Sequence, residues 1–277
     1  EPKAAGKRMG KAAREKRLWL WHAQKRVGQR ALILVAGLAV TYGALWIRFA
    51  SGSPTIARNY TAELNAPTLA MPESERAWTV YRPAIIAIQP AIREHDGWDL
   101  LNDAKPGTPE FNKAKAAVEA FAPQLATFRK AAAMPKLGYL LSDATDAELD
   151  VALNPTSTPT HSTPSENPKL FNVLLQPLGP MRGVARAMAL DARVAAAEGN
   201  GQRAVDDVTA ILGMARQTFD LPFLIGDLVG SALGNLAWAT TCDLIERNPE
   251  AFTDAHLAQL AEQIGRDSGP REFFADP

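Results

Sequence analysis

The chain has 277 residues, of which 47% are hydrophobic and 7% aromatic, and its 30 basic and 30 acidic residues leave no formal net charge. A single cysteine, Cys242, excludes an internal disulfide framework and any metal site built from several cysteines within this chain. Abundant Ala and scarce alternation of β-branched residues favour helices packed through small residues over sheets. We therefore expect an all-α protein.

The charges are distributed unevenly along the chain. Residues 1–30 have a formal charge of +8, and the remaining residues have a charge of −8. Basic residues beside an apolar stretch are typical partners of anionic lipid headgroups, which is the interpretation favoured for this segment. Membrane-tethered binding of nucleic acid through the same residues is the alternative, and it predicts a steep dependence on salt.

Residues 31–47 form an apolar stretch of seventeen residues without a formal charge. As a helix they would rise about 25 Å, slightly less than the hydrocarbon core of a bilayer, so the flanks must complete a transmembrane helix over residues 31–50. Aromatic and arginine side chains in or near the stretch are predicted to lie at the membrane interface: Trp19, Trp21, Arg30, Tyr42, Trp46 and Arg48. A buried soluble helix and a cleavable signal peptide are the alternatives.

The position of the basic residues also predicts an orientation. Lys and Arg close to a span are retained on the cytoplasmic side, so we expect a single-pass protein with a cytoplasmic N-terminus and a periplasmic or otherwise extracytoplasmic C-terminal part. Small residues within the span, Gly37, Ala39 and Gly43, could pack against another transmembrane helix.

Residues 54–153 are predicted to form an N-terminal helical subdomain. Pro72 and the glutamates after it are typical of the first turn of a helix. Pro83 and Pro90 are expected to divide the following apolar run into short helical pieces, giving a kinked hairpin.

Stronger helix signals follow in the same subdomain. Thr108 and Pro109 predict an N-cap and a first helical position, followed by an apolar stripe: Phe111, Ala114, Val118, Phe121, Leu125 and Phe128. Pro123 is expected to kink this helix. Thr145 and Glu148 match a capping box that opens another short helix.

Residues 154–168 contain four Pro and seven Ser or Thr and no aliphatic or aromatic residue. Such a segment cannot enter a core, and we interpret it as a linker between two helical subdomains. A mobile arm that becomes ordered on a partner is the alternative.

Residues 169–277 are predicted to form a C-terminal helical-hairpin subdomain. An apolar pattern bent at Pro177 and Pro180 carries Leu170, Leu174, Leu178, Met181, Ala185 and Met188. A tight turn at residues 199–201 joins it to a helix with Val205, Val208, Leu212, Ala215 and Phe219 on one face.

These two helices and their turn resemble a tetratricopeptide-type repeat. The resemblance covers about 35 residues and rests on the small residues of the first helix and on the Ala-Glu-Gly-Asn turn. Met188, Asp191 and Ala192 stand where that family's first helix has large aromatic and Leu-Gly residues. The overall layout is also similar to that of membrane-anchored helical proteins of bacteria. Both resemblances imply helical hairpins, and neither implies an activity.

Residues 221–242 combine apolar composition with Gly226, Gly230 and Gly234 at intervals of four. One face of this helix would then be bare backbone that a neighbour can approach closely, so we expect a central buried helix. A second membrane span is the alternative, which Asp227 disfavours. A last amphipathic helix should begin at Thr253 and bury Leu257, Leu260, Ala261 and Ile264.

The common catalytic and nucleotide-binding motifs are absent from the sequence. Glu94, His95, Asp96 and Asp99 form the densest ionisable cluster, which could bind a divalent metal or act as a base, although solvated helix-end residues are the ordinary explanation. Residues 146–157 fail as a calcium-binding loop because Val151 and Ser157 replace the required Gly and Glu.

Asp191 and Asp227 each interrupt an apolar helical face. If buried, they need arginine partners, for which Arg186, Arg193 and Arg216 are the candidates, and an interhelical ion pair is favoured over catalysis.

The sequence therefore predicts a non-enzymatic, membrane-anchored scaffold or accessory subunit of a membrane protein complex, with no cofactor, metal or nucleic acid. The alternative is a membrane-anchored cell-envelope enzyme with a helical fold. Its expected partners are anionic headgroups and other subunits of the complex.

Overall fold

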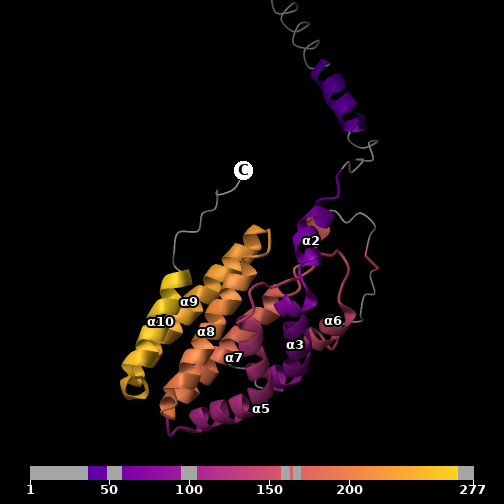
Figure 1. The fold of residues 1–277 in the computed structure, drawn as a ribbon. Helices are drawn as coiled ribbons and strands as arrows, with labels where there is room; N and C mark the ends of the chain where they lie inside the picture. The colour runs from indigo at the N-terminus through magenta and orange to yellow at the C-terminus, as the bar shows by residue number, and fades with distance from the viewer. Residues whose placement is uncertain (1–36, 49–57, 95–104, 157–162, 165–169, 268–277) are drawn as a thin grey trace, which may run out of the picture. The chain divides into compact units, whose positions relative to one another are not determined.

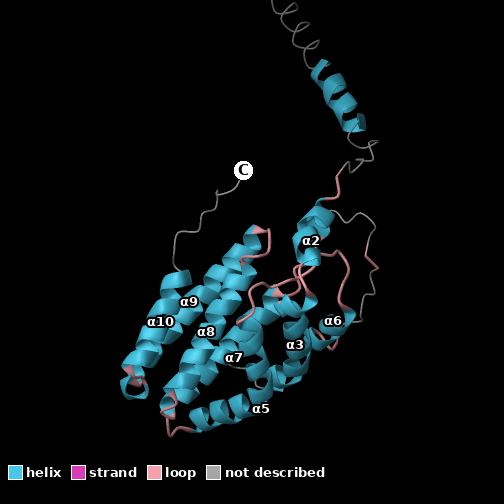
Figure 2. Cartoon of the chain, viewed as in Figure 1, coloured by secondary structure: helices cyan, strands magenta, loops and turns pink. Residues whose placement is uncertain are grey.

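The computed structural model describes residues 37–48, 58–94, 105–156, 163–164 and 170–267. Every regular element in these ranges is helical, as the sequence predicts, and β-structure within them is limited to one isolated bridge between Arg76 and Lys136 (Figure 2). The chain divides into two compact units, Glu1–Ala57 and Arg58–Pro277. In the first unit the structure describes one helix, residues 37–48.

The second unit begins with α2 (Tyr60–Ala70), a single 3₁₀ turn η1 (Glu73–Glu75) and α3 (Ala77–Glu94). Pro72 precedes the 3₁₀ turn rather than an α-helix. Pro83 and Pro90 both lie inside α3, so the expected division into short pieces is wrong. The cost of the missing backbone hydrogen bonds is offset because the same helix buries large side chains against α5, among them Tyr81 and Ile85.

Helix α5 (Pro109–Ala132) confirms the strongest local prediction. Thr108 is its N-cap and accepts a hydrogen bond from the Phe111 amide at 3.2 Å, and every residue of the predicted apolar stripe is buried. The helix continues through Pro123 to Ala132. Helix α6 (Ala147–Leu153) corrects the predicted cap: Asp146, not Thr145, is the N-cap, because its carboxylate accepts from the Leu149 amide.

The second half of the unit contains η2 (Leu170–Asn172), α7 (Leu178–Ala197) and α8 (Gly201–Thr218). The expected helix over Leu170 and Leu174 is wrong, since α7 begins at Leu178, after Pro177. Pro177 and Pro180 therefore occupy the start of the helix, where the first backbone amides need no helical partner. The predicted turn between α7 and α8 is confirmed, with Gly199 at φ +77°.

Helices α9 (Leu224–Arg247) and α10 (Asp254–Asp267) complete the unit, separated by η3 (Pro249–Ala251). Thr253 accepts from the His256 amide, as predicted for the cap of α10. In α10, Leu260 is buried as predicted, whereas Leu257 and Ala261 are exposed.

The interpretation of 221–242 as a central buried helix is wrong, because α9 packs on α7 and α8 with one side and exposes the other.

The elements on either side of the predicted linker, residues 154–168, share one hydrophobic core. Helix α5 contacts both α7 and α8, and α3 lies beside α5 (Figure 1). A buried polar contact joins the two halves: the Tyr81 hydroxyl donates to Gln217 Oε1 at 2.8 Å, and Gln217 Nε2 donates to the carbonyls of Ala131 and Met134. The predicted subdomains, 54–153 and 169–277, are therefore not separate in their cores.

Candidate functional site

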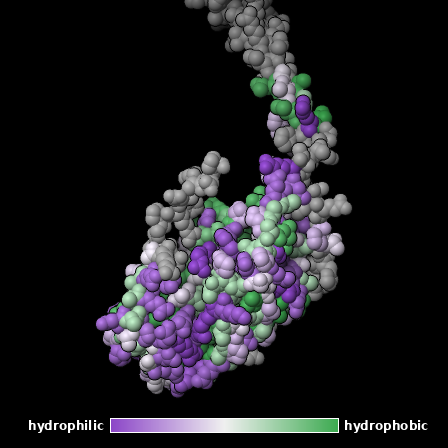
Figure 3. Space-filling model, in the orientation of Figure 1, coloured by the Kyte–Doolittle hydropathy of each residue, from purple (hydrophilic) through white to green (hydrophobic). Residues whose placement is uncertain are grey.

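The helix of residues 37–48 exposes large apolar side chains. Leu38 and Val40 are 71% and 72% exposed, and the Tyr42 and Trp46 rings stack with their centroids 6.5 Å apart. Hydrophobic residues are prominent on its visible surface in Figure 3. Three residues predicted to lie at a membrane interface are outside the described ranges: Trp19, Trp21 and Arg30.

Around Gly37 and Gly43 the space is open, because a Cβ added at either position would meet nothing within 4 Å. Ala39 is exposed on the same helix. Among the described residues, no helix combines the length and the apolar character needed to cross a membrane. The predicted span itself starts at residue 31, outside the described residues.

The glycines of α9 lie in two different surroundings. A Cβ at Gly226 would come within 2.8 Å of the Thr218 carbonyl oxygen, and one at Gly230 would come within 2.7 Å of Thr218 Oγ1. These two glycines therefore let α9 approach the C-terminal end of α8 closely. Gly234 is different, because a Cβ there would meet nothing within 4 Å.

The opposite side of α9 carries a surface that the glycine pattern does not predict, here called the α9 outer face. It consists of exposed residues at intervals of four and three: Leu224, Leu228, Ser231, Asn235, Trp238, Cys242 and Ile245. Leu224, Leu228 and Trp238 are 74%, 57% and 56% exposed. A search of the sequence for 4-3 spacing would have found this stripe, but spacing alone does not tell an exposed stripe from a buried one.

Acidic residues border the α9 outer face near both ends. Asp227 lies in the first turn of α9, and Glu246 is exposed in its last turn. No residue of the α9 outer face carries a charge. Arg247, in the last turn, is the one basic residue of α9, so the helix lacks the several Lys and Arg that amphipathic helices carry when they bind anionic bilayers, and an anionic bilayer is a poor partner for this surface.

Four charged residues from three helices form a cluster inside the second unit. Arg129 of α5 pairs with Asp191 of α7, and its Nε donates to Asp207 of α8 at 2.7 Å. Arg203 of α8 also pairs with Asp191, through Nε at 3.2 Å and through its Nη2. Both carboxylates are fully buried, while the two arginines reach solvent in part.

This cluster confirms that Asp191 forms interhelical ion pairs, but it corrects the predicted partners. Arg129 and Arg203 bind Asp191, whereas Arg193 pairs with Asp243 at 2.8 Å. Asp227 is only half-buried. The two opposite pairs leave the cluster neutral when all four groups are ionised, so it joins α5, α7 and α8 as a structural element.

Asp207 is the imperfectly satisfied member of the cluster. Within the described residues its Oδ2 atom is buried without a hydrogen-bond partner. Burial, and then the negative charge of Asp191, raise the pKa of Asp207 well above its ordinary value, and Arg129 opposes this effect. Because one of its oxygens has no partner, the ionised form of Asp207 is poorly stabilised at this position.

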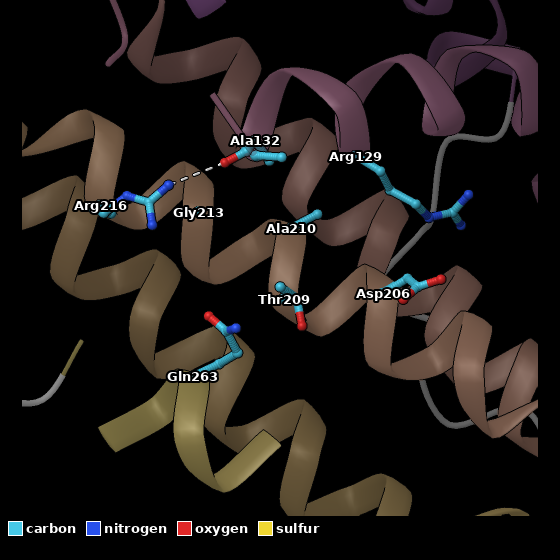
Figure 4. Close-up of a pocket in the computed structure, with 9 residues that line it drawn as sticks. Arg129, Ala132, Asp206, Thr209, Ala210, Gly213, Arg216 and Gln263 are labelled. Atoms are coloured by element: carbon cyan, nitrogen blue, oxygen red, sulfur yellow. Dashed lines mark hydrogen bonds between the residues drawn. The ribbon is translucent and has the colours of Figure 1, made fainter. Parts of the chain in front are cut away.

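A groove with a volume of about 410 Å³ lies between the C-terminal end of α5, α8 and α10. Its floor is built from small residues, among them Ala132, Ala210 and Gly213, and Figure 4 shows Arg129 and Arg216 on opposite sides of it. Arg216 points toward the Ala132 carbonyl oxygen, at 3.4 Å. Arg129 is held by Asp191 and Asp207, whereas the hydroxyl of Thr209, which also lines the groove, is buried without a hydrogen-bond partner among the described residues.

Asp146 and Glu148 belong to the segment that the sequence excludes as a calcium-binding loop, and they have an arginine partner instead. Asp146 and Glu148 both pair with Arg82, and this arginine lowers the pKa of Asp146. The cluster His95, Asp96 and Asp99 lies outside the described residues. In the part of the chain that the structure describes, no group of three or more His, Cys, Asp or Glu residues could hold a metal ion.

Comparisons of the chain with models of known protein families, with curated proteins and with solved structures found no match.

Proposed function

We propose that this protein is a non-enzymatic, single-pass membrane scaffold or accessory subunit, with residues 31–50 as its anchor and the helical unit as its interaction domain. The main observation in support of the membrane anchor is the helix of residues 37–48, whose apolar side chains are exposed on all sides. Exposed Leu38, Val40, Leu45 and Ile47 are unfavourable in water and favourable in a bilayer.

The uneven charge distribution supports the proposed orientation. The charge of +8 on residues 1–30 favours retention in the cytoplasm beside anionic headgroups, and the C-terminal part, with a charge of −8, then lies on the other side. Trp46, whose ring stacks on that of Tyr42, lies toward the C-terminal end of residues 31–50 and suits the interface on that side.

The helical unit supports a binding role over catalysis. Its buried charges are engaged in ion pairs between helices, and the two arginines of its groove, Arg129 and Arg216, both have protein partners. The α9 outer face is instead a long surface without charge, exposed along a whole helix. Surfaces of this kind are typical of protein–protein interfaces.

Membrane extraction tests the anchor. The full chain should stay in the membrane pellet after an alkaline carbonate wash, and a Leu38→Glu, Leu45→Glu double variant should move to the supernatant because two charges prevent insertion. Leu69→Glu, on an exposed residue of α2, is the matched control and should remain in the pellet. Wild-type protein in the supernatant would contradict the anchor.

Purification in mild detergent tests the scaffold role. The wild-type chain should copurify with a partner at fixed stoichiometry, and Leu228→Glu should lose this partner because the new charge lies on the α9 outer face. Leu69→Glu should retain it. A monodisperse monomer that turns over a cell-envelope substrate would exclude the role and favour the enzymatic alternative.

A further inference from the structure

The turn between α8 and α9 leads into a run of four apolar residues, 222–225, here called the apolar tip. Leu224 and Ile225 are 74% and 46% exposed. Pro222 is exposed as well, and Phe223 is partly buried against the core. Consecutive exposed apolar side chains are unfavourable in water, so a run of this kind indicates a surface that meets a protein or a membrane.

The apolar tip lies beside α2, the first element of the helical unit. Leu64 of α2 lines the same small cavity as Leu221 and Pro222, and Figure 1 shows α2 at the same end of the unit as the turn between α8 and α9. Tyr60, the first residue of α2, is also exposed, and the Arg58 guanidinium lies 5.5 Å from the centroid of its ring. Tyrosine and arginine side chains are common at membrane interfaces, where one part of the side chain is apolar and the other is hydrated.

The length of chain before α2 limits how far this end of the unit can lie from the anchor. Nine residues, 49–57, separate the helix of residues 37–48 from Arg58. A chain of this length spans at most about 35 Å. With residues 31–50 as the anchor, the end of the unit that carries α2 and the apolar tip is therefore the end that the chain holds near the bilayer.

The charges near the apolar tip favour insertion of apolar side chains over adsorption to anionic lipid. Asp220 pairs with Lys136 at 2.8 Å, and Glu63 pairs with Arg58 at 2.6 Å, so neither pair adds net charge. Asp227, two residues after the run, is acidic and half-buried. Lipid tails can cover exposed apolar side chains without electrostatic attraction, so a zwitterionic leaflet is the partner that fits this surface.

We propose that residues 222–225 insert into the lipid leaflet next to the anchor, so that the helical unit contacts the membrane through the start of α9. The proposal rests on the membrane anchor of the proposed function, which supplies the bilayer. It adds a second membrane contact to the anchor, and it leaves the α9 outer face from Leu228 to Ile245 to a protein partner.

Fluorescence quenching of the full chain in phosphatidylcholine nanodiscs tests the insertion. A Leu224→Cys, Cys242→Ser variant carries the fluorophore NBD at position 224, and the lipid carries a nitroxide quencher on its acyl chains. The label should lose much of its fluorescence and shift its emission to the blue, because it enters an apolar environment. An Ile225→Cys, Cys242→Ser variant should give the same result, so the outcome does not depend on one side chain.

An Ile245→Cys, Cys242→Ser variant is the matched control. Ile245 is 39% exposed on the same side of α9, and 21 residues separate it from Leu224, about 31 Å at 1.5 Å per residue. Its label should keep its fluorescence. Quenching at position 224 should be the same with and without anionic phosphatidylglycerol. All of these substitutions are at exposed positions, so none should prevent folding.

Four results would overturn the proposal. Absence of quenching at position 224 in an assembled nanodisc would exclude the insertion alone and leave the anchor in place. Equal quenching at positions 224 and 245 would mean that the whole α9 outer face lies on lipid. Quenching at position 224 only with anionic lipid would mean electrostatic adsorption. A chain that does not assemble into the nanodisc would refute the anchor, and with it the basis of the insertion.

Discussion

Asp207 has a carboxylate in the interior of the helical unit, where full ionisation is unfavourable. Its Oδ1 atom accepts from Arg129 at 2.7 Å, while its Oδ2 atom is buried without a partner in the described residues. Asp191, nearby and equally buried, receives two arginines and is well satisfied. The unpartnered Oδ2 atom of Asp207 therefore leaves the charged form of this carboxyl poorly stabilised.

This difference predicts an unusual pH dependence of stability. Because the pKa of Asp207 is raised in the folded state, the folded chain binds more protons than the unfolded chain above pH 4, the ordinary range of an aspartate. The stabilising effect of Asp207 should therefore be lost as the pH rises through its folded pKa. The free energy of unfolding of the wild type, relative to Asp207→Asn, should fall by up to about 1.4 kcal/mol per pH unit in this window.

Urea unfolding of both proteins between pH 4 and pH 8 measures this difference. Asp206→Asn is the matched control, because Asp206 is the exposed neighbour of Asp207 and accepts from Gln202 on the helix surface. Its difference from the wild type should not change with pH. A constant difference for Asp207→Asn would mean that the buried carboxyl stays ionised throughout.

At the scale of the elements, the packing of α9 depends on where its glycines lie. Gly226 contacts the end of α8, and Gly234 faces open space, although the sequence places both in one pattern. A side chain is therefore tolerated at one position and not at the other. The pattern predicted one covered face for all three glycines, but only Gly226 and Gly230 meet a neighbour, because the element that covers a face is a property of the tertiary structure.

Alanine substitutions at the two positions should have opposite effects. Gly226→Ala places a Cβ 2.8 Å from the Thr218 carbonyl oxygen and 3.0 Å from Leu221 Cβ, and should lower the free energy of unfolding by about 1 to 3 kcal/mol. Gly234→Ala should raise it by up to about 1 kcal/mol, since alanine has the better helix propensity. Chemical denaturation of both variants measures this, and equal effects would show that α9 does not pack closely on α8.

At the scale of the whole molecule, the helical unit should behave as one cooperative structure. Tyr81 and Gln217 are 136 residues apart and form a buried hydrogen bond, and Arg129 joins α5 to both α7 and α8. These contacts cross the segment that the sequence suggests as a boundary between subdomains. Residues 154–168 therefore connect two parts of one core.

Hydrogen exchange tests this cooperativity. Leu125→Ala, at a fully buried residue of α5, should destabilise the unit by about 2 to 5 kcal/mol. The free energy of opening that hydrogen exchange reports for buried amides of α8 should fall by the same amount. Leu69→Ala, at an exposed residue of α2, should leave that protection unchanged. Unchanged exchange in α8 of the Leu125→Ala variant would indicate two independent subdomains.

The sequence by itself determined the helical class, the cap and buried stripe of α5, and the turn between α7 and α8. Each depends on residues within one or two helical turns, where propensity, capping and 3.6-residue periodicity act. The continuous α3 through Pro83 and Pro90 required tertiary contacts, because the packing of this helix on α5 offsets two missing hydrogen bonds.

The tertiary structure alone decided which side of α9 is free and which arginines bind Asp191. Arg129 is 62 residues from Asp191 in the sequence, and no local pattern relates them. Both sides of α9 are apolar enough to be buried, so composition could not tell which of them packs on α7 and α8. Burial is a property of neighbours distant in the chain, and the α9 outer face became visible only once those neighbours were in place.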